Sequence, residues 1–372
     1  MRVDAPPLMS LIAVIACASQ APSPTPPPIA FATAAATVPP ATTLPSPATV
    51  VPTPTTNALV TPDPLGTPLA SPSSESPVAT EPQAPPSPQP QSSPAAAASP
   101  AGKGGDETLR LQVLLDRAHF SPGEIDGQGG SNTRRAQAAY EKNGGRSADL
   151  LQDAAPTLVA YTITADDVAG PFVKVPEDML EKAKLKTLGY SSPLEALGEK
   201  FHASPKLLRR LNPNARFAAG EEIQVPNASR GEAPGKAATV VVDQSDSSVT
   251  ALDAAGKVLA RYPATMGSEH DPLPLGKWKI TGVQRNPTFF YNADLFWDAD
   301  EKHAKAKIAP GPNNPVGVVW IDLSKPHYGI HGTPEPSTIG KTESHGCIRL
   351  TNWDASQLAD SVKAGTPTIL QQ

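Results

Sequence analysis

The pattern of apolar and polar positions divides the chain into three stretches. Residues 18–102 show no hydrophobic period and consist mainly of Ala, Pro, Ser and Thr. Between residues 106 and 226 apolar positions recur mostly at helical spacing, and from residue 237 onward they gather in short runs of β type. The pattern therefore predicts an unfolded segment, then two small modules, then a β-rich domain.

The first module is expected at residues 105–150 and is predicted to be helical. Its first helix has apolar residues at positions i, i+3, i+4 and i+7, namely Leu111, Leu114, Leu115 and Ala118. A turn at residues 126–127 leads to a second helix, for which Ser131 or Asn132 is the expected N-cap and residues 143–144 are the expected stop. This arrangement resembles the peptidoglycan-binding-like domain of bacterial wall enzymes, and an unrelated helical hairpin is the alternative.

The second module is expected at residues 155–227, in the order strand, helix, helix, strand. The strands are YTIT and GEEIQVP, and the helices are PLEALGEKF and SPKLLRRLNP, the latter with Ser204 as cap and Pro205 at its first position. The order, with LNPN and a glycine before the last strand, resembles a LysM domain, which binds wall glycan. A long insertion, ADDVAGPFVKVPEDMLEKAKLKTLGY, replaces the short loop of that family where glycan would dock. Glycan binding and a packing role without affinity for glycan therefore both remain open.

The last stretch, residues 237–372, follows a linker at residues 227–236 and reads mainly as strands. The runs ATVVVDQ, SVTALD, KVLARYPATM, GKWKITGV, VGVVWIDL and HYGIHG have β character, and TPTILQ closes the chain as a further strand. One amphipathic helix, NWDASQLADSVKAG, is expected to stop at Gly365. Its inward positions would be Ala355, Leu358, Ala359 and Val362. One helix among many strands predicts a β-rich sandwich or barrel with its own core.

Composition and charge refine this picture. The 45 prolines among 372 residues are too many for a chain packed throughout. Residues 18–104 are therefore expected to form a disordered Pro/Ala/Ser/Thr linker, extended at up to ~3.1 Å per residue. The formal net charge of −5 shows no basic excess, so nucleic acid is not an expected partner. No apolar run reaches the ~18 residues of a membrane-spanning helix.

The N-terminus resembles an export signal. A short apolar run, LMSLIAVIA, follows Arg2, so residues 1–17 are expected to be a secretory signal peptide. The sequence VIAC resembles a bacterial lipoprotein cleavage box, which would make Cys17 the lipid-bearing first residue and the membrane attachment. A plain signal peptide with Cys17 unmodified, or a disulfide between Cys17 and Cys347, are the alternatives. The protein is accordingly expected in the bacterial cell envelope, either periplasmic or lipid-anchored.

Cys347 lies among residues that suit nucleophilic catalysis. A thiol attacks as thiolate, and its free pKa of about 8.5 requires a neighbouring base or positive charge at neutral pH. His331 lies near the end of the run YGIHG and is the candidate base, because the loop after it can bring Cys347 beside the imidazole. The carbonyl of Gly332 could orient the imidazole, and amides around Gly346 could face a developing oxyanion. Arg349 would share a face with Cys347 on an extended segment, where it could hold a carboxylate or stabilise the thiolate.

A structural zinc site and an inert buried residue are the two alternative roles of this thiol. A structural zinc site would need a closed set of four ligands, Cys347 with His327, His331 and His345. An inert buried thiol is the second. The spacing matches no common zinc finger, and the flanking His-Gly and Ile-Arg pairs are unusual around a buried cysteine. The pattern therefore favours a reactive thiol.

The motif IHGT followed by SHGCIRL resembles the signature of the L,D-transpeptidase catalytic domain of YkuD type. The resemblance covers residues 237 to about 370 and implies that Cys347 is the nucleophile and His331 the general base, with no metal and no cofactor. It also places four further residues in the active-site motif, namely Ser344, His345, Gly346 and Arg349.

By the same resemblance, the substrate is the tetrapeptide stem of peptidoglycan. The thiol would attack the carbonyl of the third residue, release D-alanine and form a thioester. An amine of a second stem would resolve it to a 3→3 crosslink, or a lysine of an envelope protein would become attached to the wall. Water would make the enzyme a carboxypeptidase. A non-catalytic scaffold that binds peptidoglycan through its helper modules is the competing hypothesis.

Overall fold

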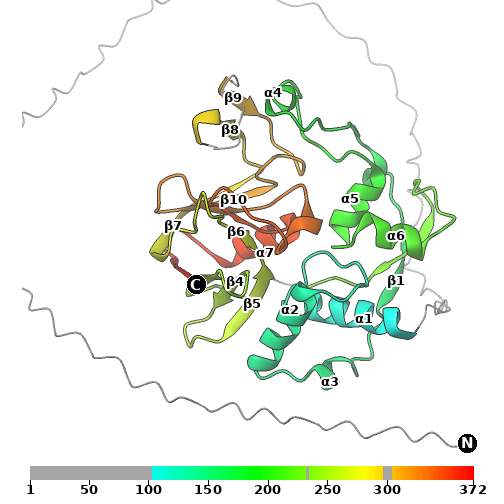
Figure 1. Cartoon of the computed structure of the whole chain (residues 1–372). Coiled ribbons are helices and arrows are strands. Elements are labelled where there is room, and N and C mark those ends of the chain that lie inside the picture. The colour runs from blue at the N-terminus through cyan, green and yellow to red at the C-terminus, as the bar shows by residue number, and fades with distance from the viewer. Residues whose placement is uncertain (1–102, 232–233, 296–303) are drawn as a thin grey trace, which may run out of the picture. The chain divides into compact units, whose positions relative to one another are not determined.

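The computed structural model describes residues 103–231, 234–295 and 304–372 (Figure 1). The expected signal peptide, Cys17 and nearly all of the proline-rich linker lie outside these residues. Every residue that the structure describes belongs to a single compact unit. None of the helices in the described ranges is long and apolar enough to cross a membrane.

The first module contains the expected pair of helices. They are α1 (Lys103–Arg117) and α2 (Ser131–Lys142), followed by the short α3 (Ser147–Leu150). Between them, the Oε1 atom of Gln112 accepts a hydrogen bond of 2.8 Å from the amide of Gly127, whose φ of +70° suits a glycine turn. Helix α2 ends at the C-cap Asn143, as predicted.

The predicted N-cap of α2 is wrong. Gly130 occupies the cap position without a side-chain hydrogen bond, and Ser131 and Asn132 lie inside the helix. The side chain of Asn132 is engaged elsewhere, because its Nδ2 donates a buried hydrogen bond of 2.8 Å to the carbonyl of Ile339. A contact with the β-rich domain has therefore replaced the local cap.

The second module has the predicted order of strand, helix, helix and strand. Strands β1 (Leu158–Thr162) and β2 (Glu222–Pro226) pair antiparallel, and α5 (Pro193–Lys200) and α6 (Pro205–Leu211) lie between them in sequence. The predicted cap of α6 is confirmed, since the hydroxyl of Ser204 accepts from the amide of Leu207. The insertion holds a 3₁₀ turn, η1 (Asp166–Val168), and a four-residue helix, α4 (Met179–Lys182).

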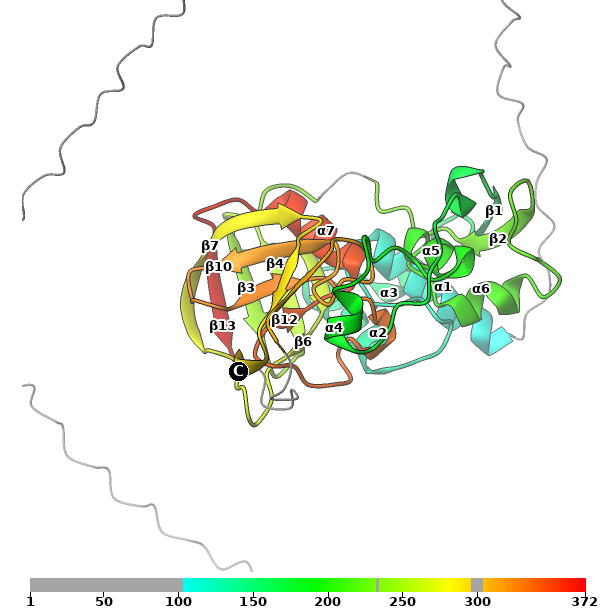
Figure 2. The same cartoon turned by 90° about the horizontal axis from the view of Figure 1, so that it is seen from above.

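The β-rich domain is built on one strongly curved sheet (Figure 2). Its nine strands run in the order β5-β4-β3-β13-β7-β10-β11-β12-β6. The two ends of this order are covalent neighbours, because β5 ends at Pro263 and β6 begins at Thr265. The sheet therefore bends back on itself towards a barrel, as the sequence predicts. Its strands are β3 (Thr239–Asp243), β4 (Ser248–Leu252), β5 (Val258–Pro263), β6 (Thr265–Met266), β7 (Gly276–Arg285), β10 (Val319–Leu323), β11 (Gly329–His331), β12 (Ile348–Arg349) and β13 (Pro367–Gln371).

One helix and one hairpin complete the domain. Helix α7 (Asn352–Ser361) is capped by the hydroxyl of Thr351. The four predicted inward residues are all buried, although Val362 is the C-cap and not part of the helix. It stops at Ser361, four residues before the predicted Gly365, which lies in the turn that leads to β13. Strands β8 (Phe289–Tyr291) and β9 (Ala306–Ile308) form a separate antiparallel pair.

A buried charged cluster ties the modules to the β-rich domain. The guanidinium of Arg230 donates to Oδ1 of Asp116 on α1 at 2.5 Å and to Oδ1 of Asp354 on α7 at 2.6 Å. Asp116 also contacts the Nδ1 atom of His202 at 2.9 Å. Burial alone would raise the pKa of Asp116, but Arg230 and His202 bring it down to about 2. The predicted linker at residues 227–236 is therefore anchored at Arg230, whose side chain is only 5% exposed.

Replacing Arg230 by alanine is expected to lower the free energy of unfolding by about 3–5 kcal/mol, because two buried carboxylates lose their cation. Chemical denaturation of the full chain measures this change. Arg216→Ala is the matched control: its ion pair with Glu221 lies at the surface, so a change below ~1 kcal/mol is expected. Equal effects of the two substitutions would contradict a structural role for the cluster.

Candidate active site

Strand pairing brings the predicted nucleophile and base to the same face of the sheet. Strands β11 and β12 are parallel, with Ile330 opposite Ile348 and His331 opposite Arg349. Both isoleucines are fully buried in the core. Because side chains alternate along a strand, His331 and Arg349 point to the other face, and Cys347 precedes Ile348 on that same side.

That face opens into a cavity of about 740 Å³. Both Cys347 and His331 line it, together with His345 and Arg349 of the predicted site. Further walls come from Trp320 and from residues around the hairpin, namely Pro287, Thr288, Phe289, Phe290 and Tyr291. The candidate nucleophile and base thus face one space large enough for part of a peptide.

His331 is held in one orientation by two neighbours. Its Nδ1 lies 2.7 Å from the carbonyl oxygen of Gly332, which is the contact expected from the sequence. Since a carbonyl can only accept, Nδ1 carries the proton and Nε2 is left as the basic nitrogen. The ring of Trp320 stacks on the imidazole, with centroids 5.4 Å apart and planes inclined by 18°. The imidazole is therefore fixed and ready to accept a proton at Nε2.

The surroundings keep this imidazole neutral. Burial lowers the pKa of His331 to about 4; the hydrogen bond to Gly332 opposes the shift, and the positive charge of Arg349 adds to it. The side chain is 4% exposed. A neutral imidazole at physiological pH is the protonation state that a general base requires.

The thiol of Cys347 is free and partly exposed. Its Sγ donates to the carbonyl oxygen of His327 at 3.7 Å, and within the described part of the chain it makes no hydrogen bond to His331. Burial raises the pKa of Cys347 above its usual value, although the backbone of Gly329 and the charge of Arg349 act in the opposite direction. The expectation that neighbouring charge would favour the thiolate is met only in part, because desolvation outweighs Arg349. The resting pair is a thiol and a neutral imidazole.

Comparison with known proteins assigns the domain that carries this site. The profile of the L,D-transpeptidase catalytic domain, YkuD, matches residues 237–370. The Bacillus subtilis protein YkuD, named as an L,D-transpeptidase, is 30% identical over 181 residues, which are 48% of this chain and 93% of that protein. The chain belongs to the L,D-transpeptidase family. The transpeptidase domain thus coincides with the β-rich domain and contains Cys347 and His331.

Solved structures of transpeptidases are also similar. L,D-transpeptidase 3 from Mycobacterium tuberculosis, in complex with a faropenem-derived adduct, is 19% identical with a TM-score of 0.31, over 41% of this chain and 75% of that chain. An L,D-transpeptidase from Mycobacterium smegmatis is 23% identical with a TM-score of 0.30, over 36% of this chain and 58% of that chain. The profile match begins at residue 237, so the resemblances of residues 105–150 and 155–227 to wall-binding domains stay predictions.

Two residues of the predicted motif hold the backbone around Cys347, the candidate nucleophile. The hydroxyl of Ser344 donates to the carbonyl oxygen of Cys347 at 2.6 Å, and the amide of Ser344 bonds to the carbonyl oxygen of Gly267. Gly346 has a φ of +90°, and a Cβ there would lie 2.8 Å from Cε1 of Tyr328. The loop therefore requires glycine at this position and fixes the backbone on which the thiol stands.

Some residues of the site carry no signal that sequence reasoning detected. Trp320 lies in a run that reads simply as a buried strand, yet its ring covers His331. Asn352 reads as a helix start, yet its Oδ1 accepts from the amide of Val318, and a Cβ on Gly332 would lie 2.2 Å from that oxygen. Gly332 therefore has two roles: its carbonyl orients the imidazole of His331, and its lack of a side chain lets Asn352 pack closely against the backbone.

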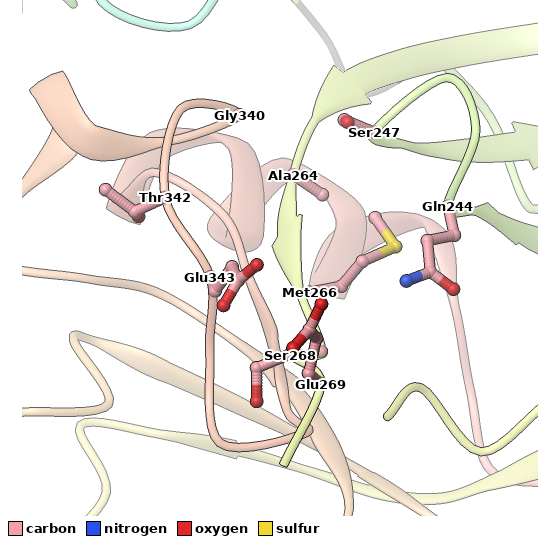
Figure 3. A pocket seen from close by; sticks show the side chains of 10 residues that line it. Gln244, Ser247, Ala264, Met266, Ser268, Glu269, Gly340, Thr342 and Glu343 are labelled. Carbon is pink, nitrogen blue, oxygen red and sulfur yellow. The ribbon is translucent and has the colours of Figure 1, made fainter. Parts of the chain in front are cut away.

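A smaller cavity of about 320 Å³ lies beside the loop that leads to Cys347 (Figure 3). Figure 3 shows Glu343 on that loop and Glu269 on the segment after β6, both around this space. Neither Cys347 nor His331 lines it. In the described ranges no group of three or more His, Cys, Asp or Glu side chains is arranged to hold a metal ion.

Proposed function

We propose that this protein is a cysteine-dependent L,D-transpeptidase that acts on the tetrapeptide stems of peptidoglycan. The observation that carries the proposal is the shared cavity of Cys347 and His331, in a domain that belongs to this family. The neutral imidazole with Nδ1 bonded to Gly332 supports a base-assisted attack by the thiol.

In the first half of the proposed reaction, Sγ of Cys347 bonds to the carbonyl carbon of the third stem residue while its proton passes to Nε2 of His331. The C–N bond to D-alanine then breaks, and the leaving amine takes the proton from the imidazole. Within the described residues the amides of Gly346 and Cys347 are paired with no acceptor, which supports their use as donors to the oxyanion. The product is a thioester on Cys347.

In the second half, an amine attacks the thioester and His331 accepts its proton. The C–S bond breaks, and the proton returns to the sulfur. A second stem gives a 3→3 crosslink, a lysine of an envelope protein gives wall attachment, and water gives a shortened stem. The same domain would act as a carboxypeptidase if water resolved the thioester.

Incubation of the purified protein with tetrapeptide muropeptides tests the proposal by mass spectrometry. The expected products are free D-alanine and a crosslinked dimer that lacks one D-alanine. Tripeptide products without dimer would support the carboxypeptidase, and unchanged substrate would contradict both. Added peptide with a free lysine distinguishes a protein acceptor, since the adduct carries the mass of that peptide.

We further propose that the protein is exported and held to a membrane through Cys17, with residues 105–150 and 155–227 binding the wall. Lipid attachment at one end of a long proline-rich linker would let the transpeptidase reach peptidoglycan at a distance from the membrane. Cys17→Ser is expected to move the protein from the membrane fraction to the soluble fraction of the cell. Unchanged membrane association of the variant would contradict the anchor.

A further inference from the structure

A segment outside the transpeptidase domain forms part of the catalytic cavity. The insertion between β1 and α5 contributes Glu177, Asp178 and Met179 to the same cavity that holds Cys347. By sequence this segment belongs to the LysM-like module, where it reads as an overlong loop at the expected glycan site. In the structure, the middle part of the insertion lines the cavity that contains the thiol of Cys347.

The insertion is docked by apolar packing against the hairpin of β8 and β9 (Figure 1). Leu188 of the insertion and Tyr291 and Ile308 of the hairpin are buried in one cluster. Met179 of α4 and its C-cap Ala183 pack against that cluster. Since the hairpin also lines the cavity, α4 and the hairpin form one continuous wall.

Backbone hydrogen bonds fix the insertion at its far end. The amide of Leu188 donates to the carbonyl oxygen of Pro310 at 3.0 Å, and the amide of Asn313 donates to the carbonyl oxygen of Leu188 at 2.9 Å. The side chain of Asn313 adds a bond of 2.9 Å to the carbonyl oxygen of Gly189. A Cβ on Gly311, where φ is +146°, would lie only 2.2 Å from the carbonyl oxygen of Leu188. Only glycine fits at this position, so the insertion and the segment around Gly311 are closely packed against each other.

The orientation of Met179 is also set locally. The carboxylate of Asp178 caps α4 by accepting a hydrogen bond of 2.9 Å from the amide of Glu181, which makes Met179 the first helical residue. An apolar side chain is thereby held at a cavity whose hairpin side presents Phe289 and Tyr291. Apolar and aromatic walls suit the aliphatic parts of a peptide.

We infer that Met179 binds the peptide stem of the substrate, and that the docked insertion makes the LysM-like module a structural part of the transpeptidase site. The inference rests on the proposed function for the identity of the peptide. Leu188 and Gly311 act through Met179, as residues that position it. The isolated family domain would lack this wall.

The test measures protection of Cys347 by the peptide, whether bound or held as the thioester, separately from the release of D-alanine. Tetrapeptide muropeptide is titrated into the full-length protein, and protection of Cys347 against alkylation by iodoacetamide gives a half-protecting concentration. Met179→Ala is expected to raise this concentration about tenfold, because an apolar contact with the peptide is lost. Alkylation without peptide should proceed at the wild-type rate, since the small reagent needs no contact with the wall.

Gly311→Ala is expected to weaken protection in the same direction by displacing the insertion. Gly256→Ala is its matched control: φ is +81° there, but no atom lies within 4 Å of the added Cβ, so wild-type protection is expected. Thermal melting verifies that each variant is folded. Met179→Ala remains decisive if Gly311→Ala does not fold, because it leaves the backbone contact intact.

Wild-type protection in folded Met179→Ala would overturn the inference, and so would the absence of any protection in the wild-type protein. Protection without release of D-alanine would instead contradict the proposed reaction while leaving the binding role of Met179 supported. The two failures are therefore distinguishable in one set of measurements.

Discussion

Cys347→Ala is expected to reduce the release of D-alanine from tetrapeptide muropeptides to background, a loss of at least about 10,000-fold. The variant lacks the only atom that forms the thioester in the proposed reaction, and the chemistry cannot be redistributed to a neighbour. Mass spectrometry of the reaction mixture measures the loss. Thioester formation can be followed in the wild-type protein as a mass increase on the peptide that contains Cys347.

Cys347→Ser serves as the conservative variant, because it keeps the size of the side chain while weakening the nucleophile. Binding to insoluble peptidoglycan should persist in both variants, since the predicted wall-binding modules are untouched. D-alanine release at the wild-type rate by Cys347→Ala would refute the mechanism. Labelling with a carbapenem probe tests the scaffold hypothesis. A scaffold would be modified at Cys347 no faster than a free thiol, whereas the proposed enzyme would be modified faster.

His331→Gln is expected to lower kcat by roughly 100- to 10,000-fold, because the thiol loses the group that accepts its proton. Glutamine can still bond to the carbonyl of Gly332, so the loss reports proton transfer more than packing. His270→Gln is the control, since His270 is exposed and does not line the cavity, and near wild-type kcat is expected there. A kcat within tenfold of wild type in His331→Gln would contradict the assignment of the base.

The pH dependence of kcat/KM provides an independent measurement on the same residue. Burial lowers the pKa of His331 to about 4, so the imidazole stays neutral as pH falls through 6.5 and is lost as a base only near pH 4. The acid limb of the profile is therefore expected near pH 4 in the wild-type enzyme. It should disappear in His331→Gln, and an acid limb near pH 6.5 would contradict the burial argument.

The placement of the candidate site residues could be predicted from sequence because it depends on local signals. Period-two alternation places His331 on a strand, and the SHGC motif brings Cys347 back to the neighbouring strand. The carbonyl of Gly332 is adjacent in sequence, so its contact with the imidazole needs no long-range information. Strand–helix–helix–strand order was likewise predictable, because the cap at Ser204 is a local signal.

The features that the sequence did not reveal depend on contacts between segments that are distant in the chain. The cap of α2 was mispredicted because Asn132 bonds to the carbonyl of Ile339 in another domain. The sequence placed the insertion where glycan would dock but gave no sign of its contact with the β-rich domain, because that contact joins Leu188 to a loop more than a hundred positions away. The raised pKa of Cys347 depends on burial, which the residues next to it do not reveal.

The protonation of Cys347 in the resting enzyme affects how easily the thiol is oxidised. Peroxide and similar oxidants attack sulfur mainly as the anion, so a high pKa slows the formation of sulfenic acid at Cys347. A protein exposed to an oxidising milieu would then keep its nucleophile chemically intact between turnovers. Reactivity would arise only for a bound carbonyl, during the transfer of the proton to the imidazole.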